Sequence, residues 1–160
     1  MYRALVEAAG KDRVDLPPAE SHHLVKVLRA RPGDPFLALD GRGAVWQCRL
    51  RREQLAWYGE IVAEVREHRE SALAVTLAQS LIKKDKFEWV IQKAVELGVA
   101  NIVPVIAWRT EVLLKEVSLE NRMRRWRKIL VEAFRQSCRT HLPSLCEPVE
   151  LATCLKTTSA

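Results

Sequence analysis

Three lysines stand close together where an apolar segment gives way to a predicted helix. Lys83, Lys84 and Lys86 follow the apolar run 73–78 and flank Asp85, where the helical pattern begins. In open α/β sheets ligands collect at the carboxyl ends of the strands, and the N-terminus of a helix adds a partial positive charge there. Ammonium groups at such a point suit the phosphates of a nucleic acid. A solvated charged loop has the same composition, so both interpretations stay open.

A second basic group lies on a long predicted helix, residues 118–139. Two acidic residues, Glu120 and Glu132, are too few to neutralise it. Its surface could contact RNA, or it could simply solubilise the helix through pairing four residues apart. Near the end of the same helix Gln136 and Arg139 are three residues apart and so share a face. The basic residues are Arg122, Arg124, Arg125, Arg127 and Lys128.

Other patterns that could carry chemistry have plainer explanations. Gly41-Arg42-Gly43 is half of a dinucleotide-binding motif, but no helix opens after it, so a hairpin turn is predicted. His22-His23 precedes a helical apolar stripe, which favours a helix start or a surface position over catalysis. The cysteines are too widely spaced for a zinc site, so we expect reduced structural thiols and no metal. The cysteines are Cys48, Cys138, Cys146 and Cys154.

The charge of the chain is uneven. The 160 residues carry a net charge of +6. Residues 1–70 hold 12 basic against 11 acidic side chains, whereas residues 71–160 hold 14 against 9. A basic excess in one half favours a polyanionic partner, although many basic proteins bind no nucleic acid. No apolar run approaches the roughly 18 residues that span a bilayer, and the N-terminus has no signal-peptide pattern, so a cytoplasmic protein without a membrane span is expected.

The first 70 residues predict a compact β-barrel of short strands with one small helix. Pro17-Pro18 opens that helix, because proline is tolerated in the first turn. Leu24, Val27 and Leu28 recur in it at helical spacing and are expected to form one buried stripe. Expected turns at 31–34 and 40–43 carry Pro-Gly and Gly-x-Gly signals, and the expected strands are 2–7, 36–39, 44–50 and 58–65.

After a charged linker at 66–71 the pattern changes to a β-α-β unit, which implies a parallel sheet. The apolar run 73–78 has the length of a strand, Asp85 is expected to cap the next helix, and Gly98 to end it. Residues 99–106 form the second expected strand. The chain is therefore divided into domains at 1–70 and 71–160. The apolar positions of the first helix are Phe87, Val90, Ile91 and Ala94.

The long helix begins a second β-α unit. Ser118 is expected to cap it, and Pro143 to stop it near Arg139. Residues 149–155, beyond Pro148, are too few to complete an open α/β sheet. The inward stripe of the helix is expected to be Leu119, Met123, Trp126, Leu130, Ala133 and Ser137.

Two sets of motifs, one on each side of the expected linker, carry a resemblance. The first is His-Leu-Val-Lys-Val-Leu-Arg at 23–29, followed by Pro32-Gly33-Asp34 and the Asp-Gly-Arg-Gly turn at 40–43. The second is more specific and runs over 79–99, then through Ile102-Val103-Pro104, Arg109, Glu132-Ala133, Gln136-Ser137, Arg139 and Pro143. Together they resemble the bacterial 16S ribosomal RNA uridine-N3 methyltransferases. The first set is similar to their N-terminal PUA-like barrel and the second to the opening of their α/β domain.

The resemblance implies a fold and an activity. Members belong to the SPOUT superfamily, whose α/β domain ends in a deep trefoil knot that binds S-adenosylmethionine. They act as homodimers and methylate N3 of one uridine in the 16S RNA of the small ribosomal subunit. Their Gly-Pro-Glu-Gly-Gly loop and Leu-Gly-x-Arg-x-Leu-Arg-x-Glu-Thr segment do not occur in this sequence. We therefore expect an incomplete α/β domain that lacks the knot, with the principal catalytic arginine and the cofactor-binding residues in the missing segment.

For this chain the resemblance implies RNA docking. The lysines at 83–86 are expected to hold backbone phosphates, and cations of the barrel to extend that track. A non-catalytic RNA-binding module is the alternative. A DNA-binding regulator is not favoured, because no helix-turn-helix spacing appears. The expected RNA contacts are Arg3, Lys26, Arg29, Arg42, Lys83, Lys84, Lys86, Arg109, Gln136 and Arg139.

Overall fold

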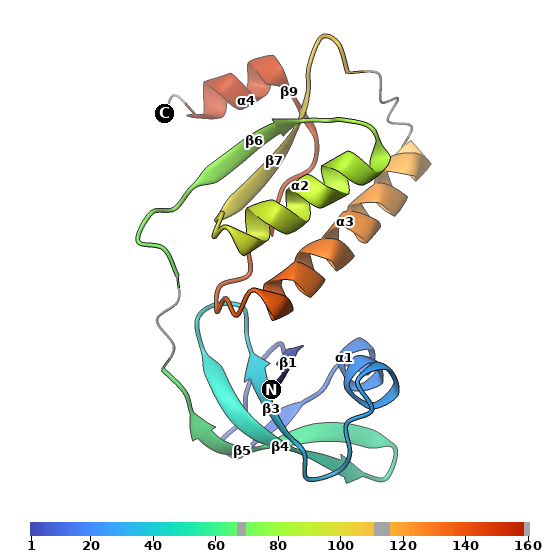
Figure 1. The fold of residues 1–160 in the computed structure, drawn as a ribbon, viewed down its shortest axis with the longest axis vertical. Coiled ribbons are helices and arrows are strands. Elements are labelled where there is room, and N and C mark those ends of the chain that lie inside the picture. The colour runs from blue at the N-terminus through green and yellow to red at the C-terminus, as the bar shows by residue number, and fades with distance from the viewer. Residues whose placement is uncertain (67–69, 111–115, 159–160) are drawn as a thin grey trace. The chain divides into compact units, whose positions relative to one another are not determined.

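The computed structural model describes residues 1–66, 70–110 and 116–158. The chain falls into two compact units, Met1–Glu70 and Ser71–Ala160, coloured blue to green and green to red in Figure 1. Three residues of the expected linker, 67–69, lie outside the described part of the chain.

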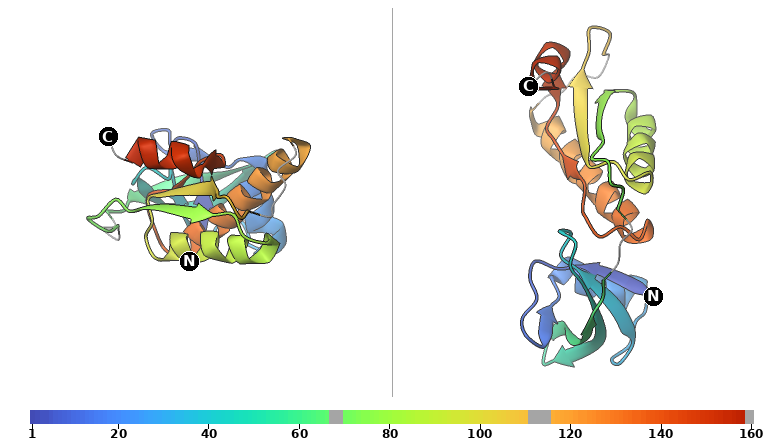
Figure 2. Two further views of the ribbon diagram at one scale, coloured as in Figure 1. Left: turned by 90° about the horizontal axis from the view of Figure 1, so that it is seen from above. Right: turned by 90° about the vertical axis from the view of Figure 1, so that its left-hand side faces the viewer.

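A five-stranded mixed sheet forms the first unit. Its strands are β1 (Tyr2–Leu5), β2 (Arg13–Asp15), β3 (Pro35–Leu39), β4 (Val45–Glu53) and β5 (Ala56–Glu64). They are ordered β1-β3-β4-β5-β2, with β1 parallel to β3 and the other neighbours antiparallel. The sheet is strongly curved (Figure 2). The four strands expected from the sequence are confirmed, whereas β2 escapes prediction because three residues are too few to show alternation.

Two turns set the register of β3, and both are predicted correctly. In the first, the Asp34 N–H donates to the Arg31 carbonyl (3.0 Å) and the Asp34 carboxylate accepts from the Arg31 N–H (2.8 Å). Gly33 has φ +94°, a conformation that this turn requires and that glycine adopts without strain. In the second turn, the carboxylate of Asp40 accepts hydrogen bonds from the N–H groups two and four residues later, at 2.8 and 3.0 Å.

The core of the first unit is packed tightly around Gly59 of β5. A Cβ atom on this residue would lie 2.6 Å from Phe36 Cζ, 2.8 Å from Val14 Cγ2 and 2.9 Å from Cys48 Cβ. All three side chains are fully or almost fully buried. The missing side chain of Gly59 therefore makes the space in which side chains from three other strands meet.

The helical segment of the first unit changes type halfway. α1 (Pro18–His22) is followed by η1 (His23–Val27), a π-helix closed by a hydrogen bond from the N–H of Leu28 to the carbonyl five residues earlier (2.9 Å). Leu24 is buried, but Val27 is 59% exposed, so the expected buried stripe is wrong at Val27. The wider π turn rotates Val27 away from the position that α-helical spacing would give it.

A parallel sheet forms the second unit. β6 (Thr76–Ser80), β7 (Asn101–Ile106) and β8 (Ser144–Leu145) follow one another across it, and β9 (Val149–Glu150) also pairs with β7. The helix α2 (Lys84–Glu96) connects β6 to β7, so the expected β-α-β unit is confirmed. β6 begins three residues later than expected, because its ladder with β7 starts at the pair Thr76 and Asn101. Leu73 consequently stays 72% exposed.

The two ends of α2 differ in how well the sequence predicts them. Lys83 occupies the N-cap position without a side-chain capping bond, so the expected cap at Asp85 is wrong. Asp85 lies in the first turn instead, where its charge favours the helix dipole. Gly98, with φ +91°, ends the helix as predicted. The expected apolar face is confirmed by the burial of Phe87 and Ile91.

The long helix α3 (Glu116–Gln136) is shifted toward the N-terminus relative to its prediction. Ser118 lies inside the helix, so it is not the N-cap. Cys138 has φ +60°, a left-handed conformation that ends the helix before Pro143 is reached. The inward face includes the expected Met123, Trp126, Leu130 and Ala133, and also Phe134, which is fully buried.

The two long helices of the second unit pack against each other. The rings of Phe87 and Trp126 lie 4.7 Å apart between centroids, and Arg125 Nη2 donates to Glu88 Oε2 at 2.7 Å. The short helix α4 (Leu151–Thr158) contacts β7 and lies on the face of the sheet opposite α2 (Figures 1 and 2). In the described part of the chain, every helix is too short or too polar to span a membrane.

Candidate nucleic-acid interface

The carboxyl ends of β6 and β7 bring together cations that are distant in sequence. Because the two strands are parallel, both end at the same edge of the sheet. The N–H of Leu81 donates to the Val105 carbonyl (2.9 Å) and so continues the pairing to that edge. Lys83 and Lys86, after β6, and Arg109, after β7, are all exposed there. Lys84 is the first residue of α2 and stands between these two lysines in the sequence, and its side chain is not among the described ones.

A tight turn fixes the backbone that carries Arg109. The Thr110 N–H donates to the Ala107 carbonyl (2.9 Å), and the Ala107 N–H donates to Thr110 Oγ1 (2.8 Å). Trp108 and Arg109 occupy the tip between these bonds, and Trp108 is completely exposed. Trp108 is absent from the predicted contacts. The only sign of it in the sequence is an aromatic residue beside an arginine at the end of a strand.

Arg139 lies at the other end of α2 and is part of the fold. It is 6% exposed, and its Nη1 donates to the carbonyls of Val99 (2.6 Å) and Val95 (3.4 Å), where α2 ends. A cation at a helix C-terminus favours the dipole. The Val95 carbonyl also accepts from the Gly98 N–H (3.1 Å), and Val99 lies three residues beyond the helix, so Arg139 ties the end of α2 to the segment that follows it. The 13 residues of α2 span about 20 Å, so this arginine is far from Lys83.

Gln136 lies away from the cationic edge. The prediction that Gln136 and Arg139 share a helix face is wrong, because α3 ends at Gln136 and the chain turns at Cys138. Gln136 instead lines an open groove of about 390 Å³ between α2 and α3. The other polar residues of the groove include Asp85, Glu88 and Glu132. Asp85 lies between Lys84 and Lys86, so the groove begins beside the lysine-rich edge and runs between α2 and α3 to Gln136, and Glu88 within it is paired with Arg125 at 2.7 Å.

The predicted cations of the first unit are also distributed over separate places. Arg3 of β1 is 8% exposed and therefore belongs to the interior. Lys26 and Arg29 are exposed in and just after η1, and Arg29 has the unusual φ of +57° for a side-chain-bearing residue. Arg42 is exposed in the turn after β3, whereas Arg29 precedes β3 along the chain. None of Lys26, Arg29 and Arg42 forms an ion pair with another described residue.

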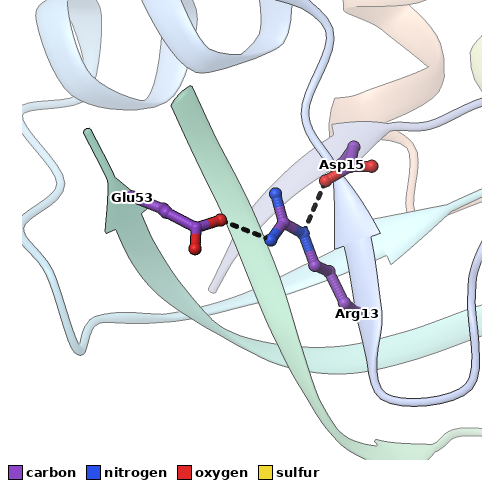
Figure 3. Close-up of polar contacts among 3 residues, drawn as sticks. All are labelled: Arg13, Asp15 and Glu53. Carbon is purple, nitrogen blue, oxygen red and sulfur yellow. Dashed lines mark hydrogen bonds and ion pairs between the residues drawn. The ribbon is translucent and has the colours of Figure 1, made fainter. Parts of the chain in front are cut away.

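Other arginines of the first unit are neutralised by carboxylates. Arg13 donates from Nε to Asp15 (2.7 Å) and from Nη1 to Glu53 (2.8 Å), as Figure 3 shows, and its guanidinium lies 4.1 Å from the ring centroid of Tyr58. The bonds to Glu53 and Asp15 raise the pKa of Arg13. Arg51 is paired with Glu60 in the same way at 2.8 Å. The Arg51–Glu60 pair joins the neighbouring strands β4 and β5, Arg13 links β2 to β4 across β5, and all these pairs leave little charge for a ligand.

Metal and disulfide chemistry have no support in the described residues. No cluster of three His, Cys, Asp or Glu side chains is arranged to hold an ion. All four cysteines are free, and burial raises the pKa of Cys48 to about 11. The exposed cations are therefore the chemically distinctive groups of this part of the molecule.

Comparison with known proteins identifies the class. Residues 69–160 match the family model of the RNA methyltransferase domain, and residues 16–54 match that of the RNA methyltransferase PUA domain. The fold and these matches define the class as the family of RNA methyltransferases that carry a PUA domain. The chain belongs to this family, because the first match covers more than half of it.

The relatives are more particular. The ribosomal RNA small subunit methyltransferase E of Synechocystis sp. is 38% identical to this chain, and the match covers 92% of this chain and 48% of the relative. The Bacillus subtilis protein of the same name is 36% identical, and the match covers 78% of this chain and 49% of the relative. A crystal structure of the Neisseria gonorrhoeae enzyme of the same name, bound to S-adenosyl methionine, superposes with a TM-score of 0.90 at 34% identity, covering 97% of this chain and 65% of that one. The resemblance seen in the sequence is confirmed. The chain spans about half the length of the curated relatives it matches.

Proposed function

We propose that this chain is the RNA-docking part of a protein that transfers a methyl group from S-adenosylmethionine to N3 of a uridine in 16S ribosomal RNA. The family match supports the reaction class, and the bound S-adenosyl methionine of the Neisseria gonorrhoeae relative supports the cofactor. The observation that carries the docking role is the common edge of Lys83, Lys86 and Arg109. We further propose that the whole protein is a homodimer with a PUA-like barrel and a C-terminal knot, working in the cytoplasm on the small ribosomal subunit.

The chemistry explains why docking matters. Uridine N3 must lose its proton before it attacks a methyl group, so negative charge develops on the base and a nearby cation or donor stabilises it. The base must also be unstacked to reach the methyl donor, and alignment of the two reactants supplies much of the acceleration. Phosphate contacts at the rim of the sheet hold the RNA while the base is presented. We assign this holding role to Lys83, Lys84, Lys86 and Arg109, with Lys26, Arg29 and Arg42 as contacts of the first unit.

S-adenosylmethionine supplies the electrophilic methyl group when it is bound. The groove between α2 and α3 does not fit it. The groove between α2 and α3 is open and lined by Asp85, Glu88 and Glu132, whereas adenosyl recognition calls for an enclosed apolar slot with a few placed donors. We therefore assign no described residue to the cofactor. The second candidate for these 160 residues taken alone is a non-catalytic RNA-binding module.

Calorimetry separates the two candidates. If these residues act only in docking, titration with S-adenosylmethionine releases no binding heat, while a small-subunit RNA fragment still binds. Heat of cofactor binding from this chain would contradict our reading of the open groove.

The docking role is tested by neutralising the lysines. In the Lys83→Gln, Lys86→Gln double variant, the logarithm of the RNA-binding constant should depend less steeply on the logarithm of the salt concentration. The slope should become smaller in magnitude by about 1.5, because each lost phosphate contact removes roughly 0.7 to 0.9 from it. Lys93→Gln is a matched control, since Lys93 lies near the other end of α2 and is paired with Glu96 at 2.7 Å. An unchanged slope in the double variant, measured by filter binding with a small-subunit RNA fragment, would count against the proposal.

A further inference from the structure

We propose that Trp108 and Arg109 form a stacking platform for one unpaired base of the RNA, next to the lysines that hold its phosphates. This inference rests on the proposed function, because it takes RNA as the ligand. It adds a recognition element of a different kind, a flat aromatic surface, to the electrostatic contacts already described. The partner is accordingly a single-stranded segment rather than a duplex, whose bases are stacked on each other and unavailable.

The first argument is the exposure of Trp108 on an ordered support. The residue is 100% exposed, so its whole ring is available to a ligand. The hydrogen bonds between Ala107 and Thr110, at 2.8 and 2.9 Å, close the turn from both sides. A ring held on a closed turn loses less freedom on binding than one on an open loop, which favours stacking.

The second argument is the position of the turn relative to the lysines. The ladder pairs Ser80 with Val105, and the bond from Leu81 to Val105 carries the pairing further. Lys83 stands three residues after the end of β6, and Trp108 two residues after the end of β7. Because these two strands end at the same edge of the sheet, a nucleic-acid chain that crosses this edge meets the segments that carry both residues. Phosphate and base contacts can then come from adjacent points of one strand.

The third argument is a contrast with Trp89 on α2. Trp89 is also well exposed (61%), but it lies in the groove with Asp85, Glu88 and Glu132. Glu88 is paired with Arg125 at 2.7 Å, and the remaining carboxylates, Asp85 and Glu132, oppose the approach of a phosphate chain to this ring. At the turn, Arg109 is the next residue along the chain after Trp108, and a guanidinium plane stacks on bases as aromatic rings do. Glu150 of β9, paired with Ile106, and Asp85 of α2 add two carboxylates to this edge, against the three exposed cations Lys83, Lys86 and Arg109. Of the two exposed tryptophans, only Trp108 combines a free ring with a cationic setting.

The test compares Trp108→Ala, Trp108→Phe and Trp89→Ala in titrations with a single-stranded small-subunit RNA oligonucleotide. Alanine at 108 should weaken binding on the order of ten-fold, the usual effect of removing one base stack, and leave the salt slope unchanged. Phenylalanine keeps a ring and should recover most of the affinity. Trp89→Ala should bind like the unmodified chain. Far-ultraviolet circular dichroism of each variant checks the fold.

The possible failures are distinguishable. If Trp108→Ala binds as well as the unmodified chain while the lysine double variant binds weakly, the platform is wrong and the docking role stands. If Trp108→Ala loses the same affinity for a duplex of that sequence as for the single strand, the ring does not stack on a base and the inference is overturned. A chain that binds no small-subunit RNA overturns both proposals.

Discussion

Replacing Arg139 by alanine should destabilise the second unit, because this arginine closes the C-terminal end of α2. Nη1 lies 2.6 Å from the carbonyl oxygen of Val99 and 3.4 Å from that of Val95, and the residue is only 6% exposed. A hydrogen bond from a charged group contributes about 1.5 to 3 kcal/mol, and loss of this donor to the Val99 carbonyl adds to the cost, whereas the Val95 carbonyl keeps the Gly98 N–H at 3.1 Å. The expected cost is about 3 kcal/mol.

The measurement is thermal unfolding followed by circular dichroism at 222 nm, where α2 and α3 contribute most of the helical signal. For a unit of this size a loss of about 3 kcal/mol lowers Tm by roughly 12 °C or more. Arg139→Lys keeps the charge but has no planar fork, so it should fall between alanine and the natural residue. Arg124→Ala, an exposed arginine of α3, is the matched control and should melt within about 2 °C of the unmodified chain.

One result would refute the reasoning. If Arg139→Ala unfolds at the same temperature as the unmodified chain but binds RNA less tightly, Arg139 is an RNA contact, as its place in the sequence motif suggests. The cap interpretation would then be wrong. Loss of both properties together is the outcome we expect, because a displaced α2 also displaces Lys83 and Lys86 at its other end.

Two further outcomes follow from the first unit. Gly59→Ala should lower the urea midpoint by an amount equivalent to about 1 to 3 kcal/mol, because the new Cβ would lie 2.6 Å from Phe36 Cζ, and an unchanged midpoint would mean that the core relaxes freely. Cys48 should be labelled far more slowly than the exposed Cys146 by a thiol reagent at pH 8, since burial raises the pKa of Cys48 from 9.0 to about 11 and makes its thiolate roughly a hundred-fold rarer. The folded state retains this proton more firmly than the unfolded state, so stability should decline as pH rises from 9 toward 11. Mass spectrometry after brief labelling checks the order of reaction, and equal rates in the native protein would contradict it.

The sequence predicts those features that depend on local chemistry. Gly98 ends α2 because glycine alone adopts φ +91° without strain, and the turns at Gly33 and Asp40 have the same kind of local cause. The parallel β-α-β unit follows from the spacing of its apolar residues, and with it the common edge of Lys83 and Arg109. For the candidate site, the positions of the lysines in the fold are therefore predictable from the order of the elements.

Features that depend on deviations from regular structure are not predictable in this way. Val27 is exposed because η1 is a π-helix, and no residue type announces a π turn. Cys138 takes a left-handed conformation that is usual for glycine, so α3 ends early and Gln136 and Arg139 separate. Charge alone also cannot distinguish a buried arginine that caps a helix from an exposed one that meets RNA. The burial of Arg139 is a tertiary property.

The bond from Arg139 to Val99 joins points 40 residues apart in the chain. The segment after α2 has this donor only while the segment after α3, which carries Arg139, is in place. We therefore expect the C-terminal turns of α2 and α3 to unfold together, so that the second unit unfolds as one cooperative unit.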